Sequence, residues 1–253
     1  MSCSIAMSIF SPHVTSFGYI IIFKARLLFL AGQKHLNEAM EFYKLDGYVT
    51  HYVEIVQDHS QLFKYLAFFD TDLERQCKMC KRRADMLSAV LSELNPQHYL
   101  LVCRQLIYEI ASVYGDMAEL KTCIIQRDKP IAPSQHQTKK INSLLAQSTK
   151  FYTSYLDSLK QEGKLPEKYD ESMVRVALLA HMCLARTYSK RICPTKEQKI
   201  ENLKKSLALY QYVVEYCDGD EDGAAKLEEE LQACREMVEL LPFRLAQISQ
   251  GQD

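Results

Sequence analysis

Glycine, proline and tryptophan are scarce in this 253-residue sequence. It has 8 glycines, 7 prolines and no tryptophan, whereas tyrosine occurs 15 times. Folds built only from strands need many turns, and turns depend on glycine and proline. The composition therefore argues against an all-β fold and favours helices. A hydrophobic content of 47% is enough for a sizeable core.

The sequence also lacks a charge excess of either sign. Its formal net charge is −1, so no global field draws the protein to nucleic acid or to an anionic membrane. The nine cysteines are odd in number and scattered, mostly within helical patterns. This argues against a disulfide framework and indicates reduced thiols in the cytosol.

No Asp, Glu, Lys or Arg occurs in the first 23 residues, which end in the apolar run Phe17–Phe23. The basic segment that opens a signal peptide is missing, and Pro12 and His13 interrupt the apolar stretch. We expect residues 1–23 to be a disordered or atypical leader, and we expect no membrane span.

Helical patterns begin at Lys24. The first helix is predicted over Lys24–Leu45, ending at Asp46-Gly47, and the second over Val49–Phe69. A capping box of Thr71 and Glu74 predicts the start of the third. Its apolar residues recur at steps of three and four, which predicts one buried face: Leu73, Cys77, Cys80, Ala84, Leu87, Leu91 and Leu94.

The second half of the chain continues this pattern. Pro96 opens a helix that is predicted to end at Gly115-Asp116, with a short helix following to Arg127. After a loop at 128–136, later helices are predicted over about 141–159, 170–191, 195–217 and 224–241, the last ended by Pro242. Thr195 and Gln198 form another capping box. The stretch 173–180 has no polar face, so it should be buried between neighbours.

Short connections make successive helices antiparallel neighbours. Paired helices that bury faces only against their neighbours form an α-solenoid. The sequence therefore predicts an all-α fold of about nine helices: a right-handed α-solenoid of tetratricopeptide-like antiparallel pairs, without a strict 34-residue period. This domain is expected over residues 24–243, followed by a tail at 244–253.

Two motifs with chemical alternatives lie on the third helix. Cys77 and Cys80 form a CxxC, but no second CxxC supplies the other ligands of a zinc site, and both residues lie on the apolar face. We interpret them as core residues. The basic run Lys78, Lys81, Arg82, Arg83 lies off that face and is interpreted as solvated, not as a nuclear-import or nucleic-acid signal.

An acid-rich turn resembles an EF-hand calcium loop. Its candidate ligands have the spacing of loop positions 1, 3, 5 and 12: Asp218, Asp220, Asp222 and Glu229. Against this, the eighth position is the small Ala225, the ninth is the cation Lys226, and no partner loop exists. The alternative is a solvated turn whose acids favour the start of the next helix. We expect no metal, with calcium binding at these four residues as the alternative.

The histidines carry no catalytic pattern. His181 falls on the buried face of its helix, as a hydrogen-bonded core histidine would. His35 and Glu38, and likewise His51 and Glu54, lie one helical turn apart, a spacing too common to imply a metal. The sequence has no phosphate-binding glycine loop, HExxH or nucleophile elbow. We therefore expect neither an enzyme nor a cofactor.

Several segments carry a specific resemblance. They are residues Gln33–Arg83, LNPQHYLLVCRQ at Leu94–Gln105, KKIN at Lys139–Asn142, YLDSL at Tyr155–Leu159 and EMVELLP at Glu236–Pro242. Through them, the stretch from about Ala25 to Pro242 resembles the kinesin-family (KIF) binding protein family. Only the C-terminal part of that longer family is resembled. Residues 1 to about 23 match nothing in it, and the acids of the calcium-like turn are not a family feature.

The resemblance implies an α-solenoid that binds kinesin motor domains and blocks them from microtubules. It implies roles in microtubule organisation, axon growth and mitochondrial transport, a cytoplasmic, cytoskeleton-associated location, and no enzymatic activity. The alternatives are a helical-repeat adaptor for another protein or a calcium-responsive helical protein. Neither the kinesins bound nor the contact residues follow from the sequence.

Overall fold

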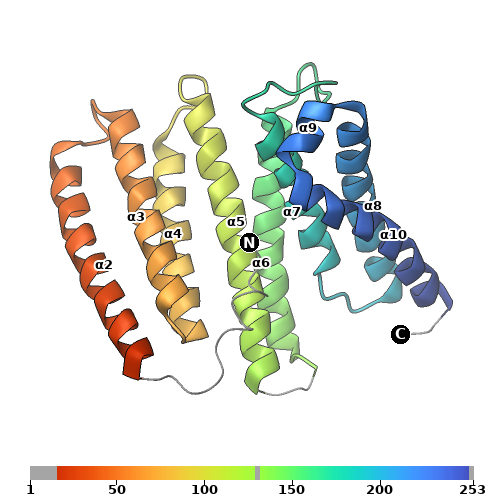
Figure 1. The fold of residues 1–253 in the computed structure, drawn as a ribbon, viewed down its shortest axis with the longest axis horizontal. Coiled ribbons are helices and arrows are strands. Elements are labelled where there is room, and N and C mark those ends of the chain that lie inside the picture. The colour runs from red at the N-terminus through yellow and green to blue at the C-terminus, as the bar shows by residue number, and fades with distance from the viewer. Residues whose placement is uncertain (1–15, 129–131, 251–253) are drawn as a thin grey trace. The chain divides into compact units, whose positions relative to one another are not determined.

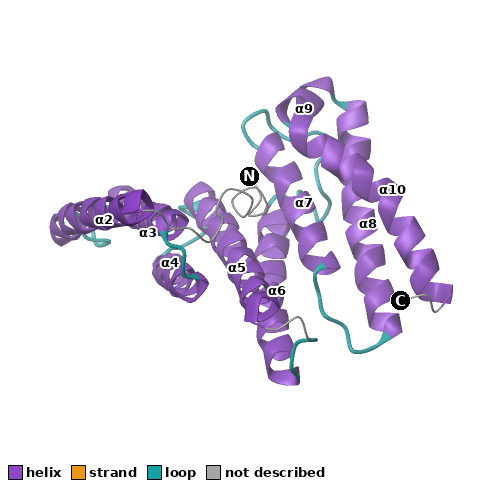
Figure 2. Ribbon diagram, turned by 60° about the horizontal axis from the view of Figure 1, so that its bottom comes forward, coloured by secondary structure: helices purple, strands orange, loops and turns teal. Residues whose placement is uncertain are grey.

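The computed structural model describes residues 16–128 and 132–250, and the regular elements in these ranges are helices (Figure 2). The prediction of an all-α fold is confirmed. The chain divides into two compact units, Met1–Val90 and Leu91–Asp253. The handedness of the predicted solenoid is a property of the whole chain and stays a prediction.

The first unit contains α2 (Ser16–Phe42), α3 (Val49–Phe69) and most of α4 (Leu73–Glu93). Helices α2 and α3 lie side by side and antiparallel (Figure 1). The rings of Phe29 and Phe63 are 4.9 Å apart, and Gln33 Nε2 lies 3.3 Å from His59 Nε2. The chain reverses at Gly47, whose φ of 106° favours glycine.

Helix α2 begins at Ser16, not at Lys24 as predicted. The predicted start relied on the first charged residues, but the apolar residues before them continue the same helical period. Ile20 and Phe23 are three residues apart, and Phe23 and Leu27 are four apart, which is the spacing of one helix face. Residues 1–15 of the predicted leader lie outside the described residues.

The predicted cap of α4 is displaced by one residue. Asp72, not Thr71, accepts the amides of Glu74 and Arg75, at 2.9 and 3.2 Å. A carboxylate here satisfies two amide donors and also faces the positive end of the helix dipole.

The predicted inward face of α4 is confirmed, with Cys77 and Cys80 each 5% exposed. The interpretation of the basic run as solvated is wrong at one residue. Lys78, Lys81 and Arg82 are exposed, whereas Arg83 is buried and its Nε donates to Ser60 Oγ at 3.1 Å. A buried guanidinium needs such partners, because leaving its donors unpaired costs free energy.

The second unit is a series of helices in which each contacts mainly its neighbours along the chain. Helix α5 packs on α6, α6 on α7, α7 on α8, and α8 on α10. The predicted antiparallel pairing is confirmed within this unit (Figures 1 and 2). The helices are α5 (Leu100–Asp128), α6 (Gln135–Ser158), α7 (Val174–Ser189), α8 (Lys196–Gly219), α9 (Glu221–Lys226) and α10 (Glu228–Gln250).

The helix break predicted at Gly115-Asp116 is wrong, because α5 runs through it as a single helix. Gly115 lies against α6, where a Cβ atom on residue 115 would meet Ser148 Oγ at 3.5 Å. Ser148 Oγ in turn donates to the carbonyl of Ala111 at 2.8 Å. The glycine marks a close helix–helix approach and not a turn.

The end predicted at Pro242 is also wrong, because α10 contains this proline and continues to Gln250. Proline removes one amide hydrogen bond inside a helix. Burial outweighs that loss here, since Leu241 and Ile248, on one face of the helix, are 0% and 4% exposed. Residues 244–250 of the predicted tail therefore belong to α10.

Two capping interactions start helices of this unit. Thr195 Oγ1 accepts the amide of Gln198 at 3.3 Å, which is one of the two hydrogen bonds of the capping box predicted for α8. The capping box of Ser134 and Gln137 at α6 is complete in both directions, and it was missed in a segment predicted as loop.

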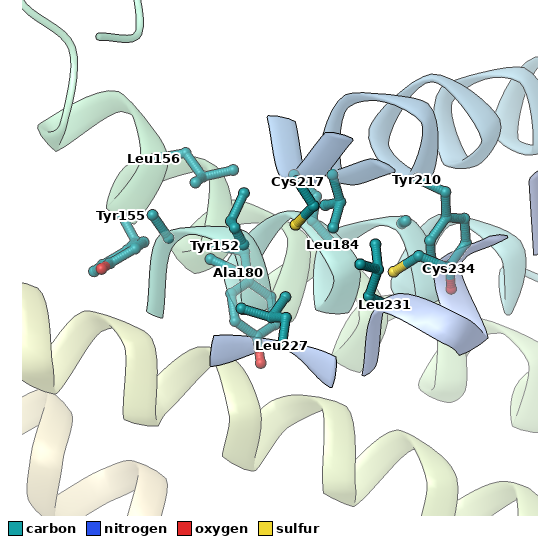
Figure 3. Close-up of a cluster of buried hydrophobic side chains, with 14 of the residues drawn as sticks. Tyr152, Tyr155, Leu156, Ala180, Leu184, Tyr210, Cys217, Leu227, Leu231 and Cys234 are labelled. Carbon is teal, nitrogen blue, oxygen red and sulfur yellow. The ribbon is translucent and has the colours of Figure 1, made fainter. Parts of the chain in front are cut away.

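The core of the second unit surrounds α7 (Figure 3). Ala177, Leu178, Ala180 and Ala185 are fully buried, which confirms the prediction that this helix lies between neighbours. The alanines let adjacent helices approach closely, and larger side chains from those helices fill the space between them: Tyr152, Tyr155, Tyr210, Leu227 and Leu231.

We expect Gly115→Ala to raise the free energy of unfolding by about 0.5–1 kcal/mol, because alanine is the better helix former and its Cβ fits at ordinary contact distance. Gly32→Ala is the matched control. Its Cβ would lie 3.0 Å from Leu62 Cδ1, so its gain should be smaller. Urea unfolding measures both; a destabilising Gly115→Ala would contradict the continuous helix.

Candidate protein-interaction surfaces

The long connection between α6 and α7 is held against the other helices of the second unit by hydrogen bonds and ion pairs. Tyr169 is 5% exposed; its amide donates to Tyr216 Oη at 3.0 Å, and its hydroxyl lies 3.0 Å from that of Tyr212. Beside it, Lys168 pairs with Asp220 at 2.8 Å. Lys226 Nζ donates to the carbonyl of Glu171 at 3.0 Å. The connection is therefore held on both sides of Tyr169.

His181 lies beneath this connection, as the core histidine that the sequence predicted. It is 4% exposed, its ring centroid is 4.3 Å from that of Tyr212, and Nε2 lies 3.4 Å from Tyr169 Oη. Nδ1 is buried with no hydrogen-bond partner among the described residues. Burial lowers the pKa of His181 to about 4, because the apolar surroundings disfavour the charged ring. The histidine is thus neutral and structural near pH 7.

This histidine should make stability depend on pH. A folded pKa of about 4 lies below the ordinary 6.5, so the unfolded chain binds more protons. The stabilisation is fully present above pH 6.5 and is lost as the pH falls toward 4. Relative to His181→Phe, the wild type should lose about 2–3 kcal/mol between pH 7 and pH 4.

Urea unfolding at both pH values measures this difference. His35→Phe is the control, because the His35 side chain is 77% exposed, and it should follow the wild type. Equal pH dependence in the wild type and in His181→Phe would contradict the buried neutral histidine.

The four candidate calcium ligands do not lie in a loop. Asp218 lies in the last turn of α8, Asp220 caps that helix, Asp222 lies within α9 and Glu229 lies in the first turn of α10. Asp218 pairs with Arg235 at 2.7 Å, and Asp220 with Lys168 at 2.8 Å. Among the side chains that the structure describes, which do not include that of Asp222, no three histidine, cysteine or acidic groups are placed together as a metal site.

A terbium titration tests the calcium alternative directly. With Asp218 and Asp220 engaged by cations, we expect no saturable luminescence. A saturable signal that Asp220→Ala removes would restore a calcium site at this turn.

The histidines of the two histidine–glutamate pairs, His35 with Glu38 and His51 with Glu54, have different environments. His35 Nδ1 lies 3.4 Å from Glu38 Oε2 in an exposed pair. His51 stacks on Tyr43, with ring centroids 5.2 Å apart.

Exposed apolar side chains gather on the α2–α3 pair. Of the fifteen large hydrophobic residues that are exposed in the described ranges, six lie on α2 between residues 20 and 30 and three lie near the end of α3. Because the helices are antiparallel, both groups lie at the same end of the pair, where Arg26 reaches Asp70 at 3.5 Å. Large exposed apolar patches commonly mark interaction sites.

The group on α3 consists of Tyr65, Phe68 and Phe69, which we call the α3 aromatic patch. These side chains are 60%, 74% and 40% exposed, and the rings of Phe68 and Phe69 are 5.3 Å apart. They lie opposite the buried face of α3, which includes Val56 and Phe63. No sequence motif marks them, although aromatic residues off the apolar face of a helix are a signal that the sequence does carry.

Comparison with known proteins assigns the family. The family model described as KIF-1 binding protein C terminal matches residues 8–248. The chain belongs to this family. Relatives named KIF-binding protein are similar to it over most of its length: that of Homo sapiens is 48% identical over 223 residues, that of Xenopus tropicalis 46% over 226, and that of Drosophila melanogaster 30% over 224.

These matches cover 87–89% of the chain but only 36–37% of the relatives' own length. The resemblance to the C-terminal part of the KIF-binding protein family is therefore confirmed. Among solved structures, BtubC (BKLC) from P. vanneervenii aligns over 90% of the chain with 11% identity and a TM-score of 0.25, too low to indicate a shared fold. None of the helices in the described ranges is long and apolar enough to cross a membrane.

Proposed function

We propose that this protein binds kinesin motor domains and acts by binding, not by catalysis. Membership of the KIF-1 binding protein C-terminal family carries the proposal, together with 48% identity to a protein named for KIF binding. A series of packed helices with exposed apolar side chains is well suited to a protein partner.

The proposed consequence of binding is that the motor is kept from its microtubule. A protein that competes for the motor's microtubule-binding face needs an apolar anchor at the centre of its interface. The α3 aromatic patch is the proposed anchor, because exposed tyrosine and phenylalanine side chains bury much area at little entropic cost.

The cellular roles follow from the same proposal. A kinesin-binding regulator would act in the cytoplasm, in association with the cytoskeleton. Microtubule organisation, axon growth and mitochondrial transport are then the processes that it would influence.

Co-sedimentation of a purified kinesin motor domain with microtubules tests this function. We expect the 253-residue chain to shift the motor from the pellet to the supernatant in proportion to its concentration. If the motor still pellets with this chain but is released by a longer relative, the part of the relative that this chain lacks is needed for motor binding. If neither releases the motor, the kinesin proposal fails and the adaptor alternative stands.

A matched pair of variants tests the anchor. Phe68→Ala should weaken motor binding about tenfold or more, as expected for an aromatic hot spot. Phe243→Ala on α10 is the control, since Phe243 is 70% exposed and Phe68 is 74% exposed. Motor affinity that is equal in the two variants would reject the α3 aromatic patch as the anchor without rejecting kinesin binding.

A further inference from the structure

Basic side chains gather at one end of the second unit, where α6 begins, α7 ends and α8 begins (Figure 1). Residues 186–205, which join α7 to α8, contain seven lysine or arginine residues and two acidic residues, Glu197 and Glu201. The exposed lysines of this segment, together with two near the start of α6, form a surface that we call the basic end. They are Lys139, Lys140, Lys190, Lys196, Lys204 and Lys205.

Contacts within the unit hold these three helix ends together. Ile192, in the connection between α7 and α8, exchanges two hydrogen bonds with the side chain of Asn142 on α6, at 2.7 and 3.0 Å. Arg191 and Lys205 both lie near the ring of Tyr188 on α7, at 5.2 and 5.8 Å from its centroid. Neighbours in a helical series cover the sides of a helix, whereas the basic end is formed by helix ends.

Acidic side chains of the protein neutralise only part of this positive charge. Arg186 and Lys190 share a single carboxylate, that of Glu119 on α5. Lys205 pairs with Glu201 at 2.6 Å. These pairs are partly exposed to solvent, where an ion pair contributes little stability, so a carboxylate from another molecule can compete for the cations.

Other hydrogen bonds of these cations go to neutral acceptors. Lys196 Nζ donates to the backbone carbonyl of Ser249 on α10 at 3.0 Å. Arg191 Nη2 donates to Thr149 Oγ1 on α6 at 3.2 Å. Such bonds satisfy N–H donors without cancelling the positive charge, which therefore still attracts an acid.

The charge along α8 is arranged against the helix dipole. Residues 196–205, at its start, include four lysines and two glutamates, whereas residues 211–219, at its end, include two acids and no lysine or arginine. A helix is stabilised by acids near its N-terminus and by cations near its C-terminus. The stability of α8 therefore does not account for its lysines, whereas binding of an anionic ligand does.

The surroundings of the basic end indicate which anion fits. Among the described side chains from residue 102 to 239, no large apolar or aromatic one is exposed, so this surface offers neither a stacking platform for bases nor an apolar anchor for a membrane. Residues 215–230, at the other end of α8, contain eight acidic residues and one lysine. Because α8 has 24 residues and is about 36 Å long, a long polyanion lying along it would be repelled at that end.

We propose that the basic end binds an acidic segment of a partner protein, a short stretch of chain rich in glutamate and aspartate. Such a segment can reach the lysines of three helix ends without meeting the acidic end of α8. Lysine carries its charge on a flexible stem, so these side chains can follow carboxylates that are not held in one fixed geometry. Binding then depends on charge and is weakened by salt.

A fluorescein-labelled peptide of about twelve residues, about eight of them glutamate, provides the probe, and the same peptide with glutamine in their place is its neutral counterpart. By fluorescence anisotropy at low ionic strength, the Glu peptide should bind with a Kd of about 10–100 µM and the Gln peptide at least about tenfold more weakly. Raising the salt from about 0.02 M to about 0.15 M should weaken binding of the Glu peptide at least about threefold.

A matched pair of double variants locates the binding. Lys196→Glu with Lys204→Glu, at the basic end, should weaken binding of the Glu peptide at least about tenfold. Lys160→Glu with Lys164→Glu is the control, because these lysines are also exposed and make the same change in net charge at the other end of the unit. The first double variant places an acid in the first turn of α8, so its midpoint of urea unfolding should not fall.

Lys139→Glu with Lys140→Glu on α6 is a second basic-end variant should the first misfold. Equal binding of the two peptides, equal losses in the basic-end and control variants, or binding that survives both basic-end variants would overturn the proposal. So would tighter binding to phosphatidylserine vesicles or to single-stranded RNA than to the Glu peptide, because the ligand would then be a lipid surface or a nucleic acid. No kinesin is present, so these results are independent of the proposed function.

Discussion

Helix α7 is apolar over most of its surface, and the second unit is organised around covering it. Its alanines, Leu178 and Leu184 are buried, and α6 and α8 pack along it. The connection before α7 folds back to place Tyr169 over His181, where a polar ring would otherwise face apolar side chains alone. The connection around Tyr169, the packed core and the order of the helices thus meet one requirement. Together they exclude water from the apolar surface of α7.

Polar groups inside the protein show the same constraint at smaller scale. Arg83 is accommodated by Ser60, and Ser148 by the carbonyl of Ala111. His181 is accommodated differently, because it keeps one nitrogen near Tyr169 and loses its charge. Each solution gives a polar residue on the buried side of a helix a hydrogen-bond partner or leaves it neutral.

The exposed apolar side chains of the first unit fall into two groups of different kind. The α3 aromatic patch offers rings of the kind that anchor protein interfaces, whereas the exposed residues of α2 between 20 and 30 are mostly aliphatic. Both lie at one end of the α2–α3 pair, which an ion pair between Arg26 and Asp70 joins.

The sequence by itself determined the helical class and most helix faces, since apolar periods of three and four residues can be satisfied only by a helix with one buried side. It also predicted the core positions of Cys77, Cys80 and His181, and the resemblance identified the family. Among the candidate sites, it recovered the spacing of the calcium-like acids but not their ion pairs with Lys168 and Arg235, which come from distant segments.

Tertiary structure decided what local signals misjudged. Gly115 and Pro242 break isolated helices, yet both lie inside helices here because burial against neighbours outweighs propensity. Arg83 was predicted to be solvated because it belongs to a basic run. It is buried instead, since Ser60 on α3 accepts a hydrogen bond from its guanidinium. The exposure of the apolar residues on α2 between 20 and 30 likewise could not be read from the sequence, because the same apolar period describes a face that is covered and a face that is not.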